Sequence, residues 1–226
     1  MIHEMSYAVQ GAIRQERRFE VLANHMANAG TTGFKTQTLS FDDMLQAHMT
    51  IDTTQGTLLP TEGPLDVAIS GDGFFKIRTG QESRYTRNGN FSVDDQGVLV
   101  NSDGDAVLGE NGPITIDGTD ISIGTDGEVR VDGAVAGKLL IVDFEMKDAL
   151  EKRGGSLFAY TGPEGDEIPA AHFEVKQGSL EQSNVETMAE MTRMIETNRF
   201  YESFQKLIQT IDELNAKAIG EVGLVR

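Results

Sequence analysis

Apolar residues recur at spacings of three and four over the first 28 positions of the chain, which is the period of an amphipathic α-helix. The segment contains no proline, and Gly11 is its only glycine. Residues 29–33 then supply glycine and threonine for a turn. The pattern predicts a long helix over about residues 2–28. Its apolar stripe consists of Ile2, Met5, Val9, Ala12, Ile13, Phe19, Leu22, Ala23 and Met26.

Short alternating runs of apolar and polar residues replace this pattern between about residues 56 and 177. Runs such as 66–69, 74–78 and 128–131 predict β-strands. Between the runs stand Asp-Gly and Asn-Gly dipeptides, which tolerate the positive φ of tight turns. We expect Asp72-Gly73 and Asn88-Gly89 to form hairpin turns. Many short strands with regular turns indicate an all-β domain.

The helical period returns from about residue 185 to residue 219. Ser183 or Asn184 is expected to cap the start of this second helix. One apolar stripe consists of Met194, Tyr201, Phe204, Ile208, Ile211, Asn215 and Ala218, and a second set, Met188, Met191, Ile195, Leu207 and Leu214, widens it.

The predicted fold class is therefore α+β, with long N- and C-terminal helices forming a coiled-coil-like layer around a central all-β domain. We divide the chain into an N-terminal helix and turn (1–35), a linker without a clear pattern (36–57), a central β domain (58–180) and a C-terminal helix (181–226). The helical stripes are too long to be buried against a small β domain alone. The helices could pair with each other within one chain or, as we favour, with those of neighbouring copies.

The charge and the absence of cysteine exclude several classes of partner and chemistry. The chain has 36 acidic and 19 basic residues, a formal net charge of −17, which argues against binding to nucleic-acid phosphates or to an anionic membrane surface. Without cysteine there are no disulfides, thiolate metal ligands or cysteine nucleophiles. No apolar run approaches the ~20 residues that span a bilayer. The start of the sequence lacks the basic and apolar regions of a cleaved signal peptide.

Signals for catalytic or metal sites are weak. The four histidines are scattered, whereas a zinc site needs three or four convergent ligands. Residues 101–105 resemble only the start of a calcium loop, because Ala106 and Gly112 stand where the loop needs glycine and glutamate. Neither a nucleophile elbow nor a complete dinucleotide fingerprint is present. We expect no catalytic residue, metal or cofactor, and keep a cell-wall hydrolase and a β-rich adhesin as alternative functions.

Three stretches of the sequence stand out together. The first is Ala23-Asn24-His25-Met26-Ala27-Asn28 followed by Thr31-Thr32-Gly33-Phe34-Lys35. The second covers residues 64–75 and continues through Tyr85-Thr86-Arg87-Asn88-Gly89-Asn90-Phe91. The third covers residues 177–185 and continues through Arg199-Phe200-Tyr201-Glu202. In this order and spacing they resemble the axial proteins of the bacterial flagellum, which are the rod, hook and hook-associated subunits. That family usually has asparagine at the position of His25 and leucine at the position of Met26.

The resemblance implies a structural subunit of the basal-body rod that polymerises through its terminal helices and transmits torque. It also implies transport by the flagellar export apparatus without a cleaved signal, and partners that are copies of the chain and other rod or hook subunits. The short core and Phe200 favour the proximal rod type, with a distal rod or short hook-type subunit as the alternative.

The same resemblance suggests the residues that take part in assembly. The amides of Asn24 and Asn28, one helical turn apart, would fix the register against a neighbouring helix. Gly33 would permit the turn, and Phe34 would anchor the returning chain on the core. On the C-terminal helix the candidates are Met194, Tyr201, Phe204, Ile208 and Ile211.

Overall fold

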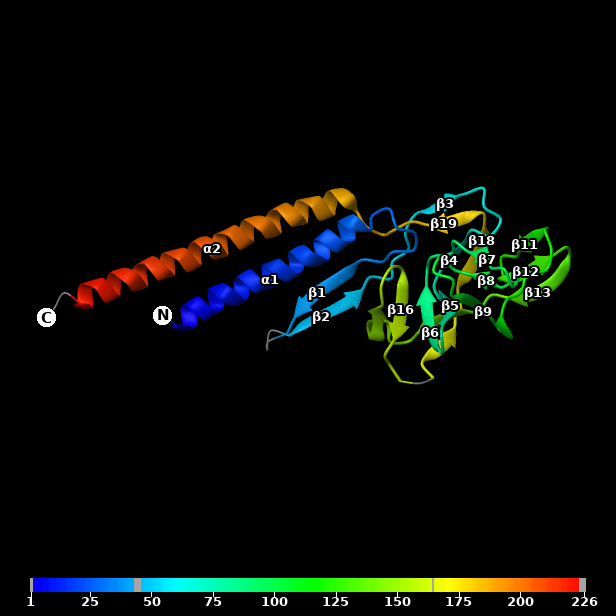
Figure 1. Cartoon of the computed structure of the whole chain (residues 1–226), viewed down its shortest axis with the longest axis horizontal. Coiled ribbons are helices and arrows are strands. Elements are labelled where there is room, and N and C mark those ends of the chain that lie inside the picture. The colour runs from blue at the N-terminus through cyan, green and yellow to red at the C-terminus, as the bar shows by residue number, and fades with distance from the viewer. Residues whose placement is uncertain (1, 43–45, 164, 224–226) are drawn as a thin grey trace. The chain divides into compact units, whose positions relative to one another are not determined.

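The computed structural model describes residues 2–42, 46–163 and 165–223 of the 226-residue chain. The chain forms two compact units, one made of residues 1–27 and 186–226 and the other of residues 28–185. The first unit consists of two helices, and the second is rich in β-strands (Figure 1). This order confirms the predicted α+β class with a central β domain between two helices.

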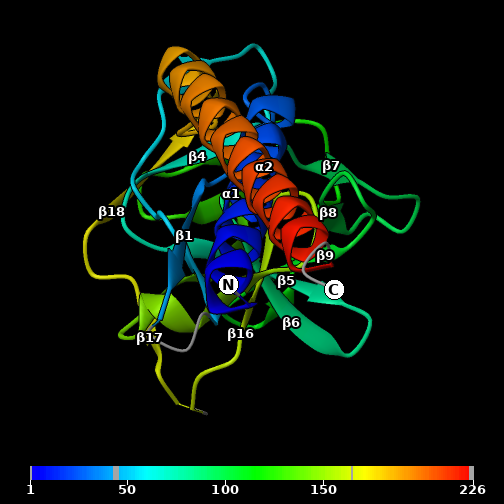
Figure 2. The same ribbon diagram turned by 90° about the vertical axis from the view of Figure 1, so that its left-hand side faces the viewer.

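Helices α1 (Ile2–Ala27) and α2 (Thr187–Gly223) are 26 and 37 residues long and run antiparallel to each other (Figures 1 and 2). Pairing within one chain, the alternative that the sequence left open, is therefore present in the folded monomer. From Glu190 onward, the buried and half-buried positions of α2 alternate in spacing between four and three residues, and they are Glu190, Met194, Thr197, Tyr201, Phe204, Ile208, Ile211 and Asn215. This is the spacing expected of a helix packed lengthwise on another. The side chains of Ile2 and Ala218, which the stripes also include, lie outside the described residues.

The face of α1 that meets α2 differs from the predicted stripe. Its best buried residues are Ala8, Leu22 and His25, whereas Val9 and Ile13 are exposed. Gly11 lies against the ring of Phe204, and a Cβ placed on Gly11 would be 2.4 Å from Phe204 Cε1. The glycine that seemed to interrupt the helical pattern is therefore the site where the ring of Phe204 fits.

Ten strands form the main sheet in the described part of the chain, in the order β15-β16-β6-β5-β9-β8-β7, with β10 beside β9, β14 beside β5, and β17 beside β14. Neighbouring strands pair antiparallel. The strands are β5 (Phe74–Thr79), β6 (Glu82–Thr86), β7 (Ser92–Val93), β8 (Leu99–Val100), β9 (Ala106–Gly109), β10 (Gly112–Pro113), β14 (Ile141–Phe144), β15 (Leu150–Lys152), β16 (Leu157–Tyr160) and β17 (Glu167–Pro169). A 3-10 turn, η1 (Lys147–Ala149), lies between β14 and β15.

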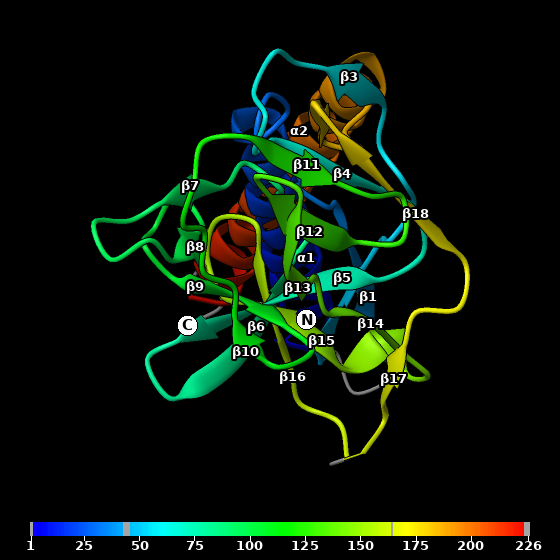
Figure 3. The same cartoon turned by 90° about the vertical axis from the view of Figure 1, so that its right-hand side faces the viewer.

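Smaller antiparallel sheets complete the unit. β11 (Ile121–Ile123), β12 (Glu128–Val131) and β13 (Ala134–Lys138) form a three-stranded sheet, seen face-on in Figure 3. β18 (Phe173–Gln177) pairs with β4 (Val67–Gly71), and β19 (Ser179–Glu181) pairs with β3 (Leu58–Pro60). Within residues 36–57, to which the sequence assigns no structure, β1 (Gln37–Phe41) and β2 (Ala47–Ile51) form a further pair.

The two turns singled out from the sequence are not hairpins, so that prediction was wrong. Asp72-Gly73 joins β4 to β5, which belong to different sheets. Asn88-Gly89 follows β6 and leads to β7, and these strands do not pair with each other. Gly89 instead passes so close to β4 that a Cβ would lie 1.6 Å from the carbonyl oxygen of Val67. Only glycine allows that approach. The Asn-Gly dipeptide therefore lets the chain pass close to a strand of another sheet and does not form a hairpin.

Other Asp-Gly dipeptides do close hairpins. Asp103-Gly104 joins the paired strands β8 and β9, and Asp126-Gly127 joins β11 and β12. Asp132-Gly133 joins β12 and β13, with φ of 50° and 84° at the two residues. Two consecutive positive φ values characterise a type I′ turn, whose twist matches that of the flanking strands.

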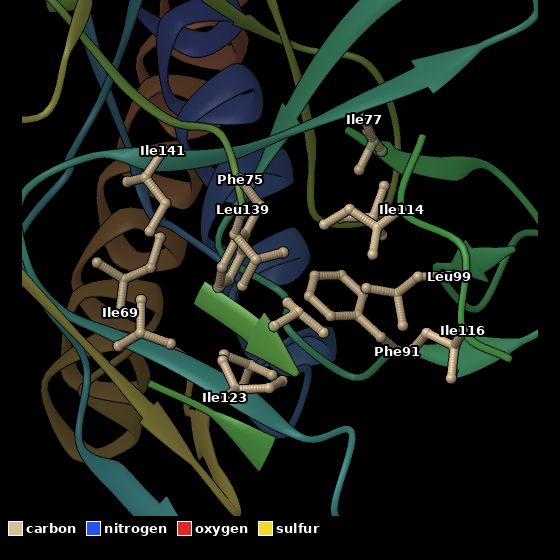
Figure 4. Close-up of a cluster of buried hydrophobic side chains, with 14 of the residues drawn as sticks. Ile69, Phe75, Ile77, Phe91, Leu99, Ile114, Ile116, Ile123, Leu139 and Ile141 are labelled. Atoms are coloured by element: carbon tan, nitrogen blue, oxygen red, sulfur yellow. The ribbon is translucent and has the colours of Figure 1, made fainter. Parts of the chain in front are cut away.

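The core of the β unit lies on both faces of β5. The adjacent rings of Phe74 and Phe75 are both buried, and they belong to two separate apolar clusters because successive residues of a strand point to opposite faces. The larger cluster, drawn in Figure 4, contains Phe75 edge-on to Phe91 at a centroid distance of 5.1 Å. The smaller one contains Phe74 edge-on to Phe158 at 5.6 Å. A strand buried on both sides gives the unit a rigid centre.

The close fit of Gly11 and Phe204 leads to a prediction for the stability of the helix pair. Gly11→Ala should destabilise the pair by about 1–2 kcal/mol because the new methyl group clashes with the ring. In a Phe204→Ala background the same change should stabilise by up to about 1 kcal/mol, since alanine is the better helix former. Thermal unfolding of the wild type, the two single variants and the double variant, followed by circular dichroism at 222 nm, measures these effects in a double-mutant cycle. Equal effects of Gly11→Ala in both backgrounds would show that the two residues do not pack together.

Candidate functional site

The candidate residues of α2 lie on the side that faces α1. Met194, Tyr201, Phe204, Ile208 and Ile211 are all half-buried. They share the alternating spacing of the buried positions, so within a single chain they serve the pairing of α1 with α2. Their part in contacts with other copies remains a prediction.

A buried contact between a histidine and a glutamate links the two helices near the end of α1. His25 Nδ1 lies 3.2 Å from Glu190 Oε2, and both side chains are almost completely buried. Arg193 Nη1 donates a hydrogen bond of 2.7 Å to the other oxygen of Glu190. Buried polar groups that must be partnered across an interface fix its register. The sequence analysis did not predict this contact. The signal for it was His25 itself, because the family that the chain resembles usually has asparagine at this position.

The two asparagines proposed to fix the register lie beside this pair. Asn24 is exposed on α1, one residue before the buried His25. Asn28 follows the last residue of α1, and its side-chain oxygen accepts a hydrogen bond of 3.2 Å from the hydroxyl of Thr31. The described contact of Asn28 therefore supports the turn after α1, and bonding of either amide to a neighbouring helix remains a prediction.

Gly33 and Phe34 pack tightly against the β unit. Gly33 has a φ of 66°, and a Cβ there would lie 2.3 Å from the backbone nitrogen of Asn88. Its N–H donates to the carbonyl of Glu181 at 2.8 Å. Phe34 is fully buried, and the ammonium of Lys152 lies 3.1 Å from the centre of its ring. Glycine is thus required twice at residue 33, by the backbone conformation and by the close approach.

Three charged side chains meet next to this turn in a fully buried cluster. Lys35 Nζ lies 2.6 Å from Glu181 Oε1, and Arg87 Nη1 lies 3.3 Å from Glu181 Oε2. The three side chains are 0–3% exposed. Each belongs to a different one of the three stretches that stand out in the sequence. These stretches are therefore brought together by a shared carboxylate.

The remaining hydrogen-bonding groups of the cluster find backbone partners. Glu181 Oε1 also accepts from the N–H of Gly56 at 2.9 Å, and Lys35 Nζ donates to the carbonyl of Thr54 at 2.5 Å. Arg87 Nη2 donates to the carbonyl of Gly71 at 2.7 Å, while its guanidinium stacks over Phe74 at 5.3 Å. Buried charges are tolerated only with this degree of pairing.

Asn184 ties the same region together and does not cap α2, which contradicts the expected capping role. Its side-chain oxygen accepts from the N–H of Thr36 at 2.8 Å, and its amide donates to the carbonyl of Asp52 at 3.0 Å. α2 begins later, at Thr187. The amide of Asn184 thus holds the segment that leaves the β unit against the segment that enters it.

The electrostatics of two lysines reflect this burial. Burial lowers the pKa of Lys35, while the neighbouring Glu181 opposes the change. Burial also lowers the pKa of Lys152 to about 8. Lys152 donates a hydrogen bond of 3.0 Å to the carbonyl of Lys35, so the two amines are part of one arrangement around the turn.

The described residues contain no group of three or more histidine, acidic or cysteine side chains placed to hold a metal ion. No helix among them is long and apolar enough to cross a membrane.

Comparison with known proteins identifies the family. A family model described as the flagellar hook protein FlgE/F/G D1 domain matches residues 68–131, and one described as the flagellar basal body rod FlgEFG protein C-terminal region matches residues 176–221. The basal-body rod protein FlgF of Caulobacter vibrioides is 33% identical over 229 residues, covering 92% of this chain and 93% of that protein. The basal-body rod protein FlgG of Bacillus subtilis is 33% identical over 255 residues, covering 95% and 97%.

The chain belongs to the flagellar basal-body rod protein family. It is a structural subunit of the bacterial flagellar rod, as the resemblance implied. Arg87 lies within the first matched region and Glu181 within the second. The ion cluster therefore joins the two parts of the chain by which the family is defined.

The cluster yields a prediction for stability. Glu181→Gln should lower the free energy of unfolding by about 3–5 kcal/mol, because it leaves the Lys35 and Arg87 charges buried without a counter-charge. Urea unfolding followed by far-ultraviolet circular dichroism measures the loss. Glu174→Gln, at an exposed position of β18, is the matched control and should change stability by less than about 0.5 kcal/mol. A loss at Glu181 no larger than in this control would contradict the assigned role.

The lowered pKa values of the two lysines predict a pH dependence. Between pH 8 and pH 9 the two lysines, whose pKa values are near 10.5 in the unfolded chain, bind more protons there than in the folded chain. Stability should therefore rise with pH in this window. Lys152→Met keeps the packing on Phe34 and should reduce the slope, whereas the exposed control Lys138→Met should keep it. Urea midpoints from pH 7.5 to 9.0 test this, and an unchanged slope in Lys152→Met would refute it.

Proposed function

We propose that the chain polymerises through its terminal helices into a coiled-coil-like layer of the rod and transmits torque along it. In this proposal it passes through the flagellar export apparatus without a cleaved signal. Its partners are copies of itself and other rod or hook subunits. The helices form the contacts between copies, and the β unit lies with its acidic surface in solvent.

The observation that carries the proposal is the apolar surface left on the helix pair after α1 and α2 have packed on each other. Ten large side chains of the two helices remain exposed, among the residues the structure describes: Tyr7, Val9, Ile13, Phe19, Met188, Met191, Ile195, Phe200, Leu207 and Leu214. With roughly half of each side chain exposed, they offer on the order of 800 Å² of apolar surface. A standard interface buries about 800 Å² on each partner, so the summed area is large enough for contacts with other chains.

The distribution of charge supports contacts through the helices. The two helical segments, 1–27 and 186–226, hold 10 acidic and 8 basic residues, whereas residues 28–185 hold 26 acidic and 11 basic residues. The helices are thus nearly neutral, and the β unit carries almost the whole net charge. Neutral surfaces approach one another without a long-range electrostatic penalty, while the charged unit keeps free copies soluble.

A proximal position in the rod, of the FlgF type, is the finer proposal. The alignment with the FlgF protein of Caulobacter vibrioides extends over 229 positions, whereas the FlgG alignments extend over 251–256 positions at similar coverage of this chain. The FlgG proteins therefore require more insertions relative to this chain. The smaller difference in length from FlgF agrees with the short core that favours the proximal rod type in the sequence analysis.

Deletion of the gene tests the function. Cells that lack the chain should be non-motile in soft agar, and their isolated basal bodies should show truncated rods without hooks by electron microscopy. A very short rod would indicate the proximal position, and a nearly complete one the distal position. Normal motility with complete basal bodies would refute the proposal.

Complementation of the deletion tests the helices. Phe200→Asp with Leu207→Asp places two charges on the exposed surface of α2 and should fail to restore motility although the protein is folded and exported. Lys206→Asp, at an exposed polar position of the same helix, is the control and should restore it. Restoration by the double variant would show that this surface is not used in assembly.

A further inference from the structure

The last segment of the β unit, residues 178–185, is attached in a different way from the strands of the core. Of its eight residues, all of which the structure describes, Glu181 alone has a buried side chain. The two apolar clusters of the described part of the chain draw their buried residues from positions 67–175, apart from Ile51. Burial of apolar side chains, the main favourable term in folding, therefore holds this segment only weakly. We call residues 178–185 the strap.

Polar contacts hold the strap in place. Within it, β19 pairs antiparallel with β3, and the two strands lie side by side in Figure 1. The Glu181 carboxylate contacts Lys35 and Arg87, and the side chain of Asn184 accepts a hydrogen bond from the N–H of Thr36. Folding exchanges such contacts for bonds with water, so each of them stabilises the closed strap only modestly. The strap thus depends on groups that water can also satisfy, whereas the core depends on apolar packing.

We propose that the strap opens and closes as one unit while the apolar core of the β unit stays folded, and that the carboxylate of Glu181 holds it closed. Local opening of this kind occurs where a segment buries few apolar contacts. Full opening returns the three charges of the cluster to water together. Partial opening would leave Lys35 and Arg87 buried without a counter-charge, which is strongly unfavourable. The strap therefore has two states, closed and open, and no stable position between them.

Opening of the strap changes the connection between the β unit and α2. The helix begins at Thr187, directly after the strap. In the closed state the carbonyl of Glu181 accepts a hydrogen bond from the N–H of Gly33, so the chain leaves the unit beside the segment that enters it. Eight released residues add up to roughly 26–29 Å of extended chain. The strap thus sets the length of the tether between the β unit and α2, and it does so without unfolding either of them.

Native-state hydrogen exchange of the full-length protein, followed by nuclear magnetic resonance, tests whether the strap opens alone. The N–H groups of Gly33, Thr36 and Gln182 report on the strap because each bonds across one of its edges. The N–H groups of Leu99 and Leu139 report on the core. We expect the strap reporters to share one opening constant, at least about tenfold larger than that of the core reporters. Equal constants in the two groups, or unrelated constants among the strap reporters, would overturn the inference.

Glu181→Gln tests what holds the strap closed. The variant should raise the exchange of all strap reporters at least about a hundredfold, because the closed state now buries two cations without a counter-charge. Thr36 is the decisive reporter, since its N–H bonds to Asn184 and not to Glu181. The core reporters should remain at least about tenfold slower than those of the strap. Glu174→Gln on β18 is the control and should leave both groups unchanged. Acceleration confined to Gly56, whose N–H bonds the carboxylate directly, would overturn the inference.

A disulfide across the strap gives a second test that leaves the ion cluster intact, because the chain contains no cysteine. The N–H of Gln182 donates to the carbonyl of Thr57 at 2.9 Å, and both residues are exposed. Residues paired in this way lie about 5.5 Å apart at Cα, which suits a disulfide between Thr57→Cys and Gln182→Cys. Oxidation should slow the exchange of Gly33 and Thr36 at least about tenfold, and reduction of the same protein should restore the wild-type exchange. Equal exchange in the oxidised and reduced forms would overturn the inference.

Discussion

The carboxylate of Glu181, buried with Lys35 and Arg87, is the interaction on which the arrangement of the β unit depends. Lys35 and Glu181 are separated by 146 residues in the chain, so their contact closes almost the whole unit. Removing such charges from water is costly, and the cost is offset only when all of them are in place. The cluster therefore tolerates one arrangement of the three segments. Gly33 and Asn184 then add backbone hydrogen bonds that hold the entering and leaving segments side by side.

The helix pair follows a different principle, in which small and polar residues meet large ones. Ala8, Gly11 and His25 lie on the contact face of α1. Phe204 of α2 packs against Gly11, and the carboxylate of Glu190 contacts His25. Such a face buries less apolar surface than leucine against leucine would. Ten large side chains of the two helices consequently remain exposed among the described residues. Under the proposed function, a folded monomer retains this surface for contacts with other copies.

The order of elements could be predicted from the sequence because helical and strand periods differ over long stretches. The buried side of α1 could not be predicted in this way. Gly11 contributes to packing because it has no side chain, and the spacing of apolar residues does not reveal such a contribution. Asp72-Gly73 and Asn88-Gly89 were wrongly predicted as hairpins for a related reason. A dipeptide reports which backbone angles are allowed, whereas the partner of each strand is set by contacts distant in sequence. The ion cluster was missed because charged residues in short motifs are usually solvated.

The separation of charge between the units connects these features with growth of an assembly. In the proposed assembly each added copy brings an acidic β unit next to others, and their repulsion is screened over about 10 Å at 0.1 M salt. The attraction between helices is short-ranged and independent of charge. In the proposed assembly, copies in dilute solution would therefore experience mainly repulsion, while copies aligned at an end would gain contacts through their helices. The separation of charge would thus favour covering the helices at the growing end.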